Sequence, residues 1–583
     1  MKASIVKSLK SPLFWLALIL TFFVLKNNIE GDRLNHVIRS DGRGYYAYLP
    51  AFFIYDDPSF QKSTEAEKRV TDSGDQFYLF KDSKGKMHNK YFPGIAIMQA
   101  PFFGMACSTS WLMGQEINGY SNIFQFFLLL GSLFYSLLGI LLFYRCLNLL
   151  FPEHERKIPW LITIFYLSSP LWFYSVVTPS FTHQHSFFLF GLFSFIALKI
   201  KEKSSWQLLL LLGLLTGLIA IVRPTNVLVV LMLPFLIGST DKLKGVWKEL
   251  TSNSGEKIWI GLAGFFSMIF FLFLIWRWQS GEWFVWSYKG EGFNWLRPHL
   301  LENLFSFRIG LFVHTPMLLF TLIGTYFLYK KNKFQFIFWW IYFLINMWVI
   351  SAWWCWDYES SFGNRPNTEH IFFLVLPIFY LFDKNRKWVW GILIFFCLIN
   401  LYRFQQYTTG AHPNQRFTAA SYFKSLQFWK SYPEYRFNFT RSPEAFGDKL
   451  EEKVLLDFQG EKVIHAKDQF PLGGETVLDT PRTFERYYYR VELDKKIRTE
   501  NFDGVNLVVD AYNDDMSKRH YLAIDLFNDR EEGKKDWKHL IFEGTIIDNF
   551  QDYTYLKIYI WNHKGKELSV RNVKITLTKY MAE

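Results

Sequence analysis

One acidic residue near the start of the chain is followed by two glycines and two tyrosines, in the run Ser40-Asp41-Gly42-Arg43-Gly44-Tyr45-Tyr46. A carboxylate in this setting can cap a helix by accepting hydrogen bonds from backbone N–H groups. It can also serve as a general base toward a hydroxyl group. The residues of the run leave both interpretations of Asp41 open, and the choice between them depends on where in the molecule the run lies.

A second group of chemically capable residues begins with a tryptophan-rich run. The segment reads Trp353-Trp354-Cys355-Trp356-Asp357-Tyr358, then Ser361-Phe362-Gly363-Asn364-Arg365-Pro366, and then Glu369. Tryptophans at this density are typical of the belt at a membrane surface. A belt does not require the Gly-x-Arg-Pro sequence, however, and the planar fork of an arginine suits a phosphate group. The segment therefore offers Arg365 as an anion-binding residue, with Asp357 and Glu369 as acidic neighbours.

Two histidines lie close together in the run Thr182-His183-Gln184-His185. Imidazoles at positions i and i+2 can bind a divalent ion or a phosphate. Ordinary histidines at a membrane interface are the alternative. With Asp357 and Glu369, His183 and His185 are candidates for a second polar site or a metal site.

Arg223 stands at the end of an apolar segment, in the run Val222-Arg223-Pro224-Thr225-Asn226. An arginine at that depth needs an anionic partner, and a lipid phosphate is the natural one. The alternative is a side chain that reaches out to the lipid head groups. Farther along, Lys289 and Arg308 belong to a long polar loop and are candidates to shape a substrate cleft.

Apolar helices must position these residues. One residue in five is aromatic, with 63 Phe and 23 Trp, and runs of about 17 to 25 apolar residues match the thickness of a bilayer core. We predict a polytopic membrane protein with about eleven transmembrane helices. Its predicted spans are 12–25, 121–144, 158–175, 185–199, 206–222, 227–238, 258–276, 316–329, 335–351, 371–382 and 388–402.

Alternate loops between these spans carry the lysines and arginines, which indicates that they face the cytoplasm. The N-terminus is then cytoplasmic and the C-terminal part lies outside, although a miscount of one span would reverse the second placement. The outer loops are 26–120, 277–315 and 352–370, and they hold both motifs. Much of the net charge of +12 belongs to the inner loops, so the charge does not indicate a nucleic-acid partner. The apolar segment Tyr91–Met105 is short and contains two prolines, which favours a re-entrant or interfacial helix over a further span.

The pattern changes after the membrane domain of residues 1–402 and a linker of residues 403–440. Residues 441–583 contain short segments of alternating polarity rich in Val, Ile, Tyr and Phe. These are 453–458, 486–493, 505–511, 520–526, 537–543, 553–561 and 569–578. The spacing predicts a soluble β-sandwich, of the jelly-roll kind. The four cysteines all lie before residue 400, so the sequence indicates no disulfide framework or zinc site.

The order of features resembles the GT-C superfamily of membrane glycosyltransferases, which includes protein mannosyltransferases and lipid A aminoarabinose transferases. These enzymes have an essential acid in the first outer loop, just after the first span, and Asp41 occupies that position. The run Lys90-Tyr91-Phe92-Pro93-Gly94 looks like the end of the same loop. The Trp-Trp-x-Trp run and the Ser-Phe-Gly-x-Arg sequence are similar to a late outer loop of bacterial members, although Glu359 and Ser360 stand where glycines are common.

The resemblance covers residues 1–402 and implies an inverting glycosyltransferase of an inner membrane. Its donor would be a polyprenyl-phosphate-linked sugar, and its acceptor a glycan, lipid or protein in the periplasm. Asp41 would be the catalytic base, and Arg365 and Arg223 would hold the donor phosphate. The candidates for the acceptor cleft are Tyr45, Tyr46, Lys289 and Arg308. A requirement for a divalent cation, Mg²⁺ or Mn²⁺, stays open. The membrane lipids are the remaining partners.

Two other functions fit the same sequence. A non-catalytic subunit of a cell-envelope transport or assembly complex would keep the fold but not the chemistry. A polymerase or ligase would move whole oligosaccharides from a lipid carrier. A scaffold would tolerate neutralisation of Asp41, Arg223 and Arg365 together, whereas an enzyme would not.

Overall fold

The architecture is taken from a computed structural model of the chain. It divides into two compact units, Met1–Leu401 and Tyr402–Glu583, which we describe separately. The structure describes residues 11–71, 78–82, 85–251, 255–288, 291–358, 361–383, 387–409, 419–427, 449–465, 467–478, 485–497, 505–514, 519–526, 537–545, 553–563 and 567–581.

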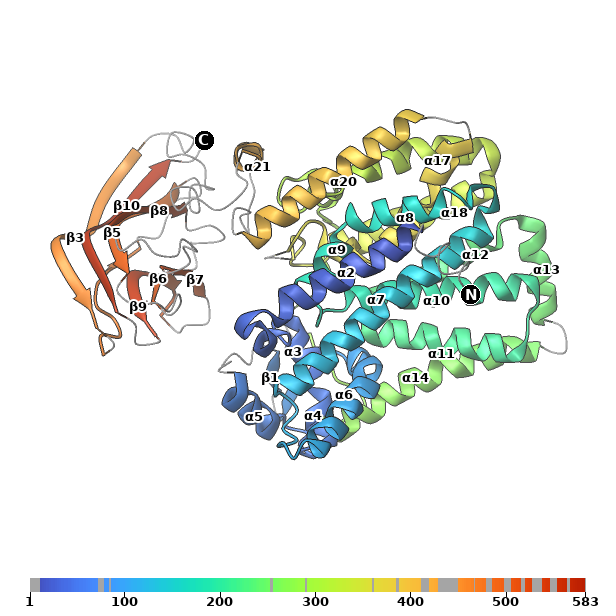
Figure 1. Cartoon of the computed structure of the whole chain (residues 1–583), viewed down its shortest axis with the longest axis horizontal. Helices are drawn as coiled ribbons and strands as arrows, with labels where there is room; N and C mark the ends of the chain where they lie inside the picture. The colour runs from blue at the N-terminus through green and yellow to red at the C-terminus, as the bar shows by residue number, and fades with distance from the viewer. Residues whose placement is uncertain are drawn as a thin grey trace. The chain divides into compact units, whose positions relative to one another are not determined.

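Long apolar helices dominate the first unit (Figure 1). Among the described residues, five helices are long and apolar enough to cross a membrane, namely α2 (Pro12–Ile29), α7 (Asn122–Leu150), α14 (Glu256–Ser280), α18 (Lys333–Ser351) and α20 (Lys387–Thr408). A sixth span is possible if the segment Pro224–Ile237, made of η3 (Pro224–Met232) and α12 (Leu233–Ile237), is joined to α13 (Thr240–Thr251). The two parts meet at a bend of 114°. The predicted number of eleven spans is therefore not confirmed.

The missing spans are apolar segments that the structure breaks or shortens. The segment predicted over 158–175 becomes α8 (Ile158–Leu167) and α9 (Pro170–Val176), because Pro170 cannot continue a helix and holds the preceding residue extended. The other shortened or polar-ended helices are α10 (His183–Glu202), α11 (Trp206–Val222), α17 (Leu319–Lys331) and α19 with η7 (Ile371–Leu374 and Leu376–Asp383).

One predicted loop is a helix instead. The lysine-bearing segment after residue 239 forms α13, which carries Leu243, Val246, Trp247 and Leu250 on one face and has no buried residue. This spacing is that of an amphipathic helix. Lysines alternate with the apolar residues along this segment, so its net basic charge does not reveal the apolar face.

Two helices of the first unit approach each other through glycines. A side chain at Gly213 or Gly217 of α11 would overlap α14, and one at Gly264 of α14 would overlap the backbone of α11. Small residues in such positions let membrane helices pack backbone to backbone. The pair α11 and α14 (Figure 1) therefore forms a closely packed support for Arg223, the residue that follows α11.

The long connection between α2 and α7 contains its own short elements. They are η1 (Gly31–His36), α3 (Asp41–Tyr46), α4 (Tyr48–Phe53), α5 (Gln61–Thr71), the paired strands β1 (Leu79–Lys81) and β2 (Met87–Asn89), and α6 (Gly94–Leu112). The predicted re-entrant or interfacial segment thus belongs to a helix of 19 residues that continues through Pro101. Later connections contain η2 (Pro152–His154), α15 (Leu300–Phe305), α16 (Leu311–His314), η5 (Pro316–Leu318) and η6 (Arg365–Asn367).

The second unit has one short helix, α21 (Ala419–Ser425), followed by eight strands. The strands are β3 (Lys449–Ile464), β4 (Gly473–Val477), β5 (Glu485–Ile497), β6 (Val505–Tyr512), β7 (Arg519–Asp525), β8 (Lys538–Thr545), β9 (Tyr555–Asn562) and β10 (Leu568–Met581). They form two antiparallel four-stranded sheets with the orders β3-β10-β5-β8 and β4-β9-β6-β7. Each sheet draws its strands from both halves of the domain, as in a jelly roll. The predicted β-sandwich is confirmed.

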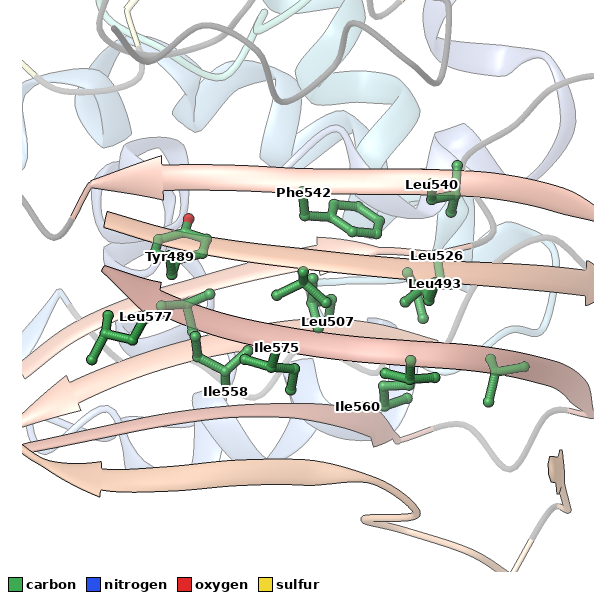
Figure 2. Close-up of a cluster of buried hydrophobic side chains, with 14 of the residues drawn as sticks. Tyr489, Leu493, Leu507, Leu526, Leu540, Phe542, Ile558, Ile560, Ile575 and Leu577 are labelled. Carbon is green, nitrogen blue, oxygen red and sulfur yellow. The ribbon is translucent and has the colours of Figure 1, made fainter. Parts of the chain in front are cut away.

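The space between the two sheets is filled by the alternate residues of their strands (Figure 2). Val491 and Leu493 of β5, Val509 of β6 and Ile558 of β9 are all completely or almost completely buried. The buried cluster consists of residues between 464 and 577. The domain therefore supplies a hydrophobic core of its own.

We accordingly expect the fragment 441–583 to express as a folded, water-soluble domain with a strand signal in circular dichroism. The variant Val509→Asp should abolish that signal, because it places an unpaired charge in the core. An unfolded wild-type fragment would mean that contacts with other parts of the protein are needed to complete the fold.

Candidate functional site

Asp41 is the first residue of α3, directly after a strained turn. The preceding residue, Ser40, has a φ of 46°, in the left-handed region that side chains other than glycine rarely adopt. Such strain persists only where the surrounding structure enforces it, and it is common at functional sites. The described hydrogen bonds of the Asp41 carboxylate go to side chains of other elements rather than to the helix backbone. The N-cap position of α3 is Ser40, and Asp41 follows it in the first turn.

Close packing fixes the position of α3. A Cβ atom at Gly42 would overlap the side chain of Ser180, and one at Gly44 would overlap the ring of Tyr91. The two glycines of the motif are thus required by neighbours that approach the backbone. Between them, Arg43 forms a buried ion pair with Glu67 of α5 at 2.7 Å.

Two groups bind the two carboxylate oxygens of Asp41. The hydroxyl of Tyr91 donates to Oδ1 at 2.8 Å, and the guanidinium of Arg365 forms an ion pair with Oδ2. Arg365 also stacks over the ring of Phe181, 4.6 Å from its centroid. Burial lowers the pKa of Arg365 to about 10, so it stays charged at neutral pH. The structure therefore brings together the acid of the first motif and the arginine of the second.

Buried asparagines that hydrogen-bond to one another fix the segment that carries Arg365. Asn364 donates to the carbonyl of Ile309 at 3.0 Å, and its own side-chain oxygen accepts from Asn367 at 2.8 Å. Asn346 of α18 in turn donates to Asn367, also at 2.8 Å. These bonds tie the loop to a long helix, so that the backbone on both sides of Arg365 is fixed.

A second charged cluster is centred on Glu369, which is completely buried. Its Oε2 contacts Nδ1 of His183 at 2.7 Å, and its Oε1 accepts from Arg223 at 3.2 Å and from Asn226 at 2.9 Å. Burial by itself would raise the pKa of Glu369, but His183 and Arg223 hold it well below its usual range. The carboxylate is therefore an anionic anchor for three other side chains.

Tyr45 lies between the two charged clusters. Its ring packs against Tyr91 with 4.6 Å between centroids, and burial raises the pKa of its hydroxyl, which also feels the charges of Arg223 and Glu369. Arg223 follows directly on α11 and lies 5.9 Å from the ring centroid of Tyr358. The two clusters are thus parts of one site at the ends of several helices.

The remaining candidates are distributed differently. Arg308 forms an ion pair with Asp357. Asp357 belongs to the same loop as Arg365, residues 352–370. Tyr46 is buried away from the site, with its hydroxyl donating to the carbonyl of Gly119 at 2.6 Å. Lys289 lies outside the described residues.

The two histidines do not converge. Both belong to the first turn of α10, where residues two apart point to nearly opposite sides of the helix. His183 contacts Glu369, while His185 contacts Gln99 at 2.8 Å. In the part of the chain that the structure describes, no group of three His, Cys, Asp or Glu side chains could hold a metal ion. Of the residues proposed for a metal site, Glu369 and Asp357 form ion pairs with arginines. The side chains of His183 and His185 have separate partners.

Several residues of the site were not among the candidates chosen from the sequence. Tyr91 and Asn226 stand inside motifs that were recognised, and their polar groups complete the coordination of Asp41 and Glu369. The asparagines around Arg365 carry no charge and have no diagnostic spacing. An order of Asn-Arg-Pro-Asn within a tryptophan-rich loop is the signal that could have identified two of them.

The variant Gly44→Ala tests the packing of the site. The added methyl group overlaps the ring of Tyr91 and approaches Tyr78, so we expect a loss of about 1–3 kcal/mol of stability and displacement of the hydroxyl that binds Asp41. The matched control is Gly104→Ala in α6, whose Cβ would meet open space. Thermal unfolding of both variants checks this, and equal melting temperatures would contradict it.

Comparisons with known proteins give a distant likeness to a solved structure. No protein family and no curated protein matches the chain. Among solved structures, the arabinosyltransferase EmbB from Mycobacterium smegmatis is similar, with a TM-score of 0.33 and 10% sequence identity. The match covers 94% of this chain and 64% of EmbB, a little under two thirds of its length. EmbB is a glycosyltransferase by name, the class that the motifs resemble, but a likeness at this TM-score assigns neither fold nor activity.

Proposed function

We propose that the chain is a glycosyltransferase of the GT-C kind. It takes a sugar from a polyprenyl-phosphate donor in an inner membrane and transfers it to a glycan, lipid or protein on the periplasmic side. The single observation that supports this most is the contact between Asp41 and Arg365, which are 324 residues apart in sequence. The transfer requires a carboxylate that accepts a proton and, close to it, a cation that binds the phosphate of the donor. The connections between membrane helices are where a sugar on a lipid can be reached.

In the proposed reaction, Asp41 accepts the proton of the acceptor hydroxyl as its oxygen attacks the anomeric carbon. The bond between that carbon and the phosphate oxygen breaks, and the electron pair leaves with the polyprenyl phosphate. Attack opposite the leaving group inverts the anomeric centre. Arg365 and Arg223 together neutralise the charge that develops on the phosphate.

The other side chains have supporting roles in this proposal. Glu369, His183 and Asn226 orient Arg223, and Tyr45 separates the two clusters. Arg308 and Asp357 border the acceptor side. A requirement for Mg²⁺ or Mn²⁺ is a separate prediction, and no step of the reaction is assigned to a metal. The β-sandwich would bind or position the acceptor, or dock a partner.

Mass analysis of the lipid-linked sugars in a deletion strain tests the function. Accumulation of a polyprenyl-phosphate monosaccharide is the expected result, and it should disappear when the wild-type gene is restored. Accumulation of lipid-linked oligosaccharides would favour a polymerase or ligase. An unchanged lipid profile would favour a non-catalytic subunit and would contradict the proposal.

The proposed orientation is tested with reporter tags. Tags inserted at Asp241 or at Asn332 should report the cytoplasm, because both positions adjoin clusters of lysines. A tag after Glu583 should report the periplasm. A cytoplasmic signal from the last tag would place the β-sandwich on the other side of the membrane and would leave the acceptor without its proposed binding domain.

A further inference from the structure

The ion pair of Asp41 and Arg365 differs from the other arginine–carboxylate pairs around the site. The side chains of Asp41 and Arg365 are 21% and 19% exposed, so both partners can be reached from outside. In the other pairs the carboxylate is more deeply buried, with 0% exposure for Glu369, 2% for Glu67 and 8% for Asp357. Only the pair of Asp41 and Arg365, among these four, can separate without leaving a charge in the protein interior.

The two partners of Asp41 also differ in what else they can bind. Tyr91 offers one hydroxyl donor, and its ring is fixed by the packing of Gly44 and Tyr45. Arg365 carries several donors in a planar fork, stacks on Phe181, and has a fixed backbone. A phosphate group matches this fork at least as well as a carboxylate does, and it can carry a larger charge.

From these contacts, and resting on the proposed function, we propose that the phosphate of the donor lipid and the carboxylate of Asp41 compete for Arg365. Binding of the donor releases Oδ2 of Asp41, and the acceptor hydroxyl is deprotonated only after this exchange. Tyr91 is the positioning residue that keeps Oδ1 in place while Oδ2 changes partners. The order of binding is therefore donor first, acceptor second.

The exchange has a chemical advantage. While Arg365 neutralises Asp41, the carboxylate is a weak proton acceptor. Once the arginine has moved to the phosphate, Asp41 faces an anion instead of a cation and its basicity rises. The site thus becomes reactive when a sugar donor is present and stays inactive when only a hydroxyl compound or water has entered.

The test measures binding of undecaprenyl phosphate to the purified full-length protein in nanodiscs, with undecaprenol as the probe that lacks phosphate. We expect Asp41→Asn to bind undecaprenyl phosphate about three- to fivefold more tightly than wild type, because the amide no longer competes for Arg365. Arg365→Gln should weaken binding. In the Arg365→Gln background, Asp41→Asn should have no further effect, which separates competition for Arg365 from simple repulsion between two anions.

The variant Tyr91→Phe gives a separate measure of positioning. Turnover should fall by about tenfold while the affinity for undecaprenyl phosphate and the melting temperature stay unchanged. The reason is that the variant loses only the hydrogen bond that orients the carboxylate of Asp41. Unchanged or weaker lipid binding by Asp41→Asn, or tighter binding that persists without Arg365, would overturn the exchange. If wild type binds undecaprenyl phosphate no better than undecaprenol, the proposed function itself fails, and the two failures are distinguishable.

Discussion

The variant Asp41→Asn is expected to transfer sugar at least about a hundredfold more slowly than the wild-type protein. The amide keeps the shape of the side chain and can still accept the hydrogen bond from Tyr91. It cannot take a proton from the acceptor hydroxyl. Membrane insertion and thermal stability should therefore be normal, and the affinity for the lipid phosphate should rise about three- to fivefold, as the competition for Arg365 requires. The measurement is initial-rate transfer by purified protein, with melting curves recorded in parallel.

A matched control is Asp241→Asn, which makes the same chemical change on α13, outside the proposed site. It should transfer sugar at the wild-type rate. A rate near wild type for Asp41→Asn would remove this acid from the reaction. Full complementation of a deletion strain by both Asp41→Asn and Arg365→Ala would replace the enzyme with a scaffold.

Within the helical unit, the largest expected effect on stability belongs to Glu369→Gln. The carboxylate of Glu369 is completely buried, and it neutralises Arg223 while it holds His183 and Asn226. Removing this carboxylate leaves Arg223, whose side chain is 19% exposed, without its anion, and it also leaves the buried His183 and Asn226 without their acceptor, which together costs up to about 3–5 kcal/mol. We expect a marked fall in melting temperature and loss of sugar transfer together.

The control for this variant is Glu116→Gln. Glu116 also pairs with an arginine, at 3.7 Å from Arg69, but both side chains are 66% exposed. An exposed pair contributes little to stability, so the control should melt like wild type. Equal melting temperatures for the two variants would mean that Arg223 finds another partner when Glu369 is neutralised.

Residue type selected the charged candidates, and the resemblance to the GT-C glycosyltransferases gave Asp41 and the arginines their expected roles, since the residues alone left Asp41 open between a helix cap and a base. Asp41, Arg223, Arg365 and Glu369 stand out because charges are rare beside apolar segments. Their pairing could not be predicted, because ion pairs between distant loops depend on how helices pack. The same limit applies to Tyr91, whose hydroxyl becomes relevant only once Gly44 brings its ring against α3.

The β-sandwich was more predictable than the membrane helices, for a physical reason. A two-residue period reports directly which side of a strand is buried, and seven of its strands follow from that pattern. Strand β4 did not, because the sequence Gly473-Gly474-Glu475-Thr476-Val477 has no apolar side chain before Val477, although its burial alternates. In the membrane unit, apolar residues occur on every side of a helix. Composition therefore locates the apolar segments but not the breaks within them, such as the one before Pro170.

The pairing of the first and last strands of the jelly roll determines how the domain can be re-engineered. Lys449 at the start of β3 and Tyr580 near the end of β10 are register partners, so the two ends of the domain meet at one point of its sheet. A short linker could join them, and a circularly permuted chain opened at another turn would keep every strand pairing. By the same geometry the whole domain can be spliced into a surface loop of a host protein without stretching either chain.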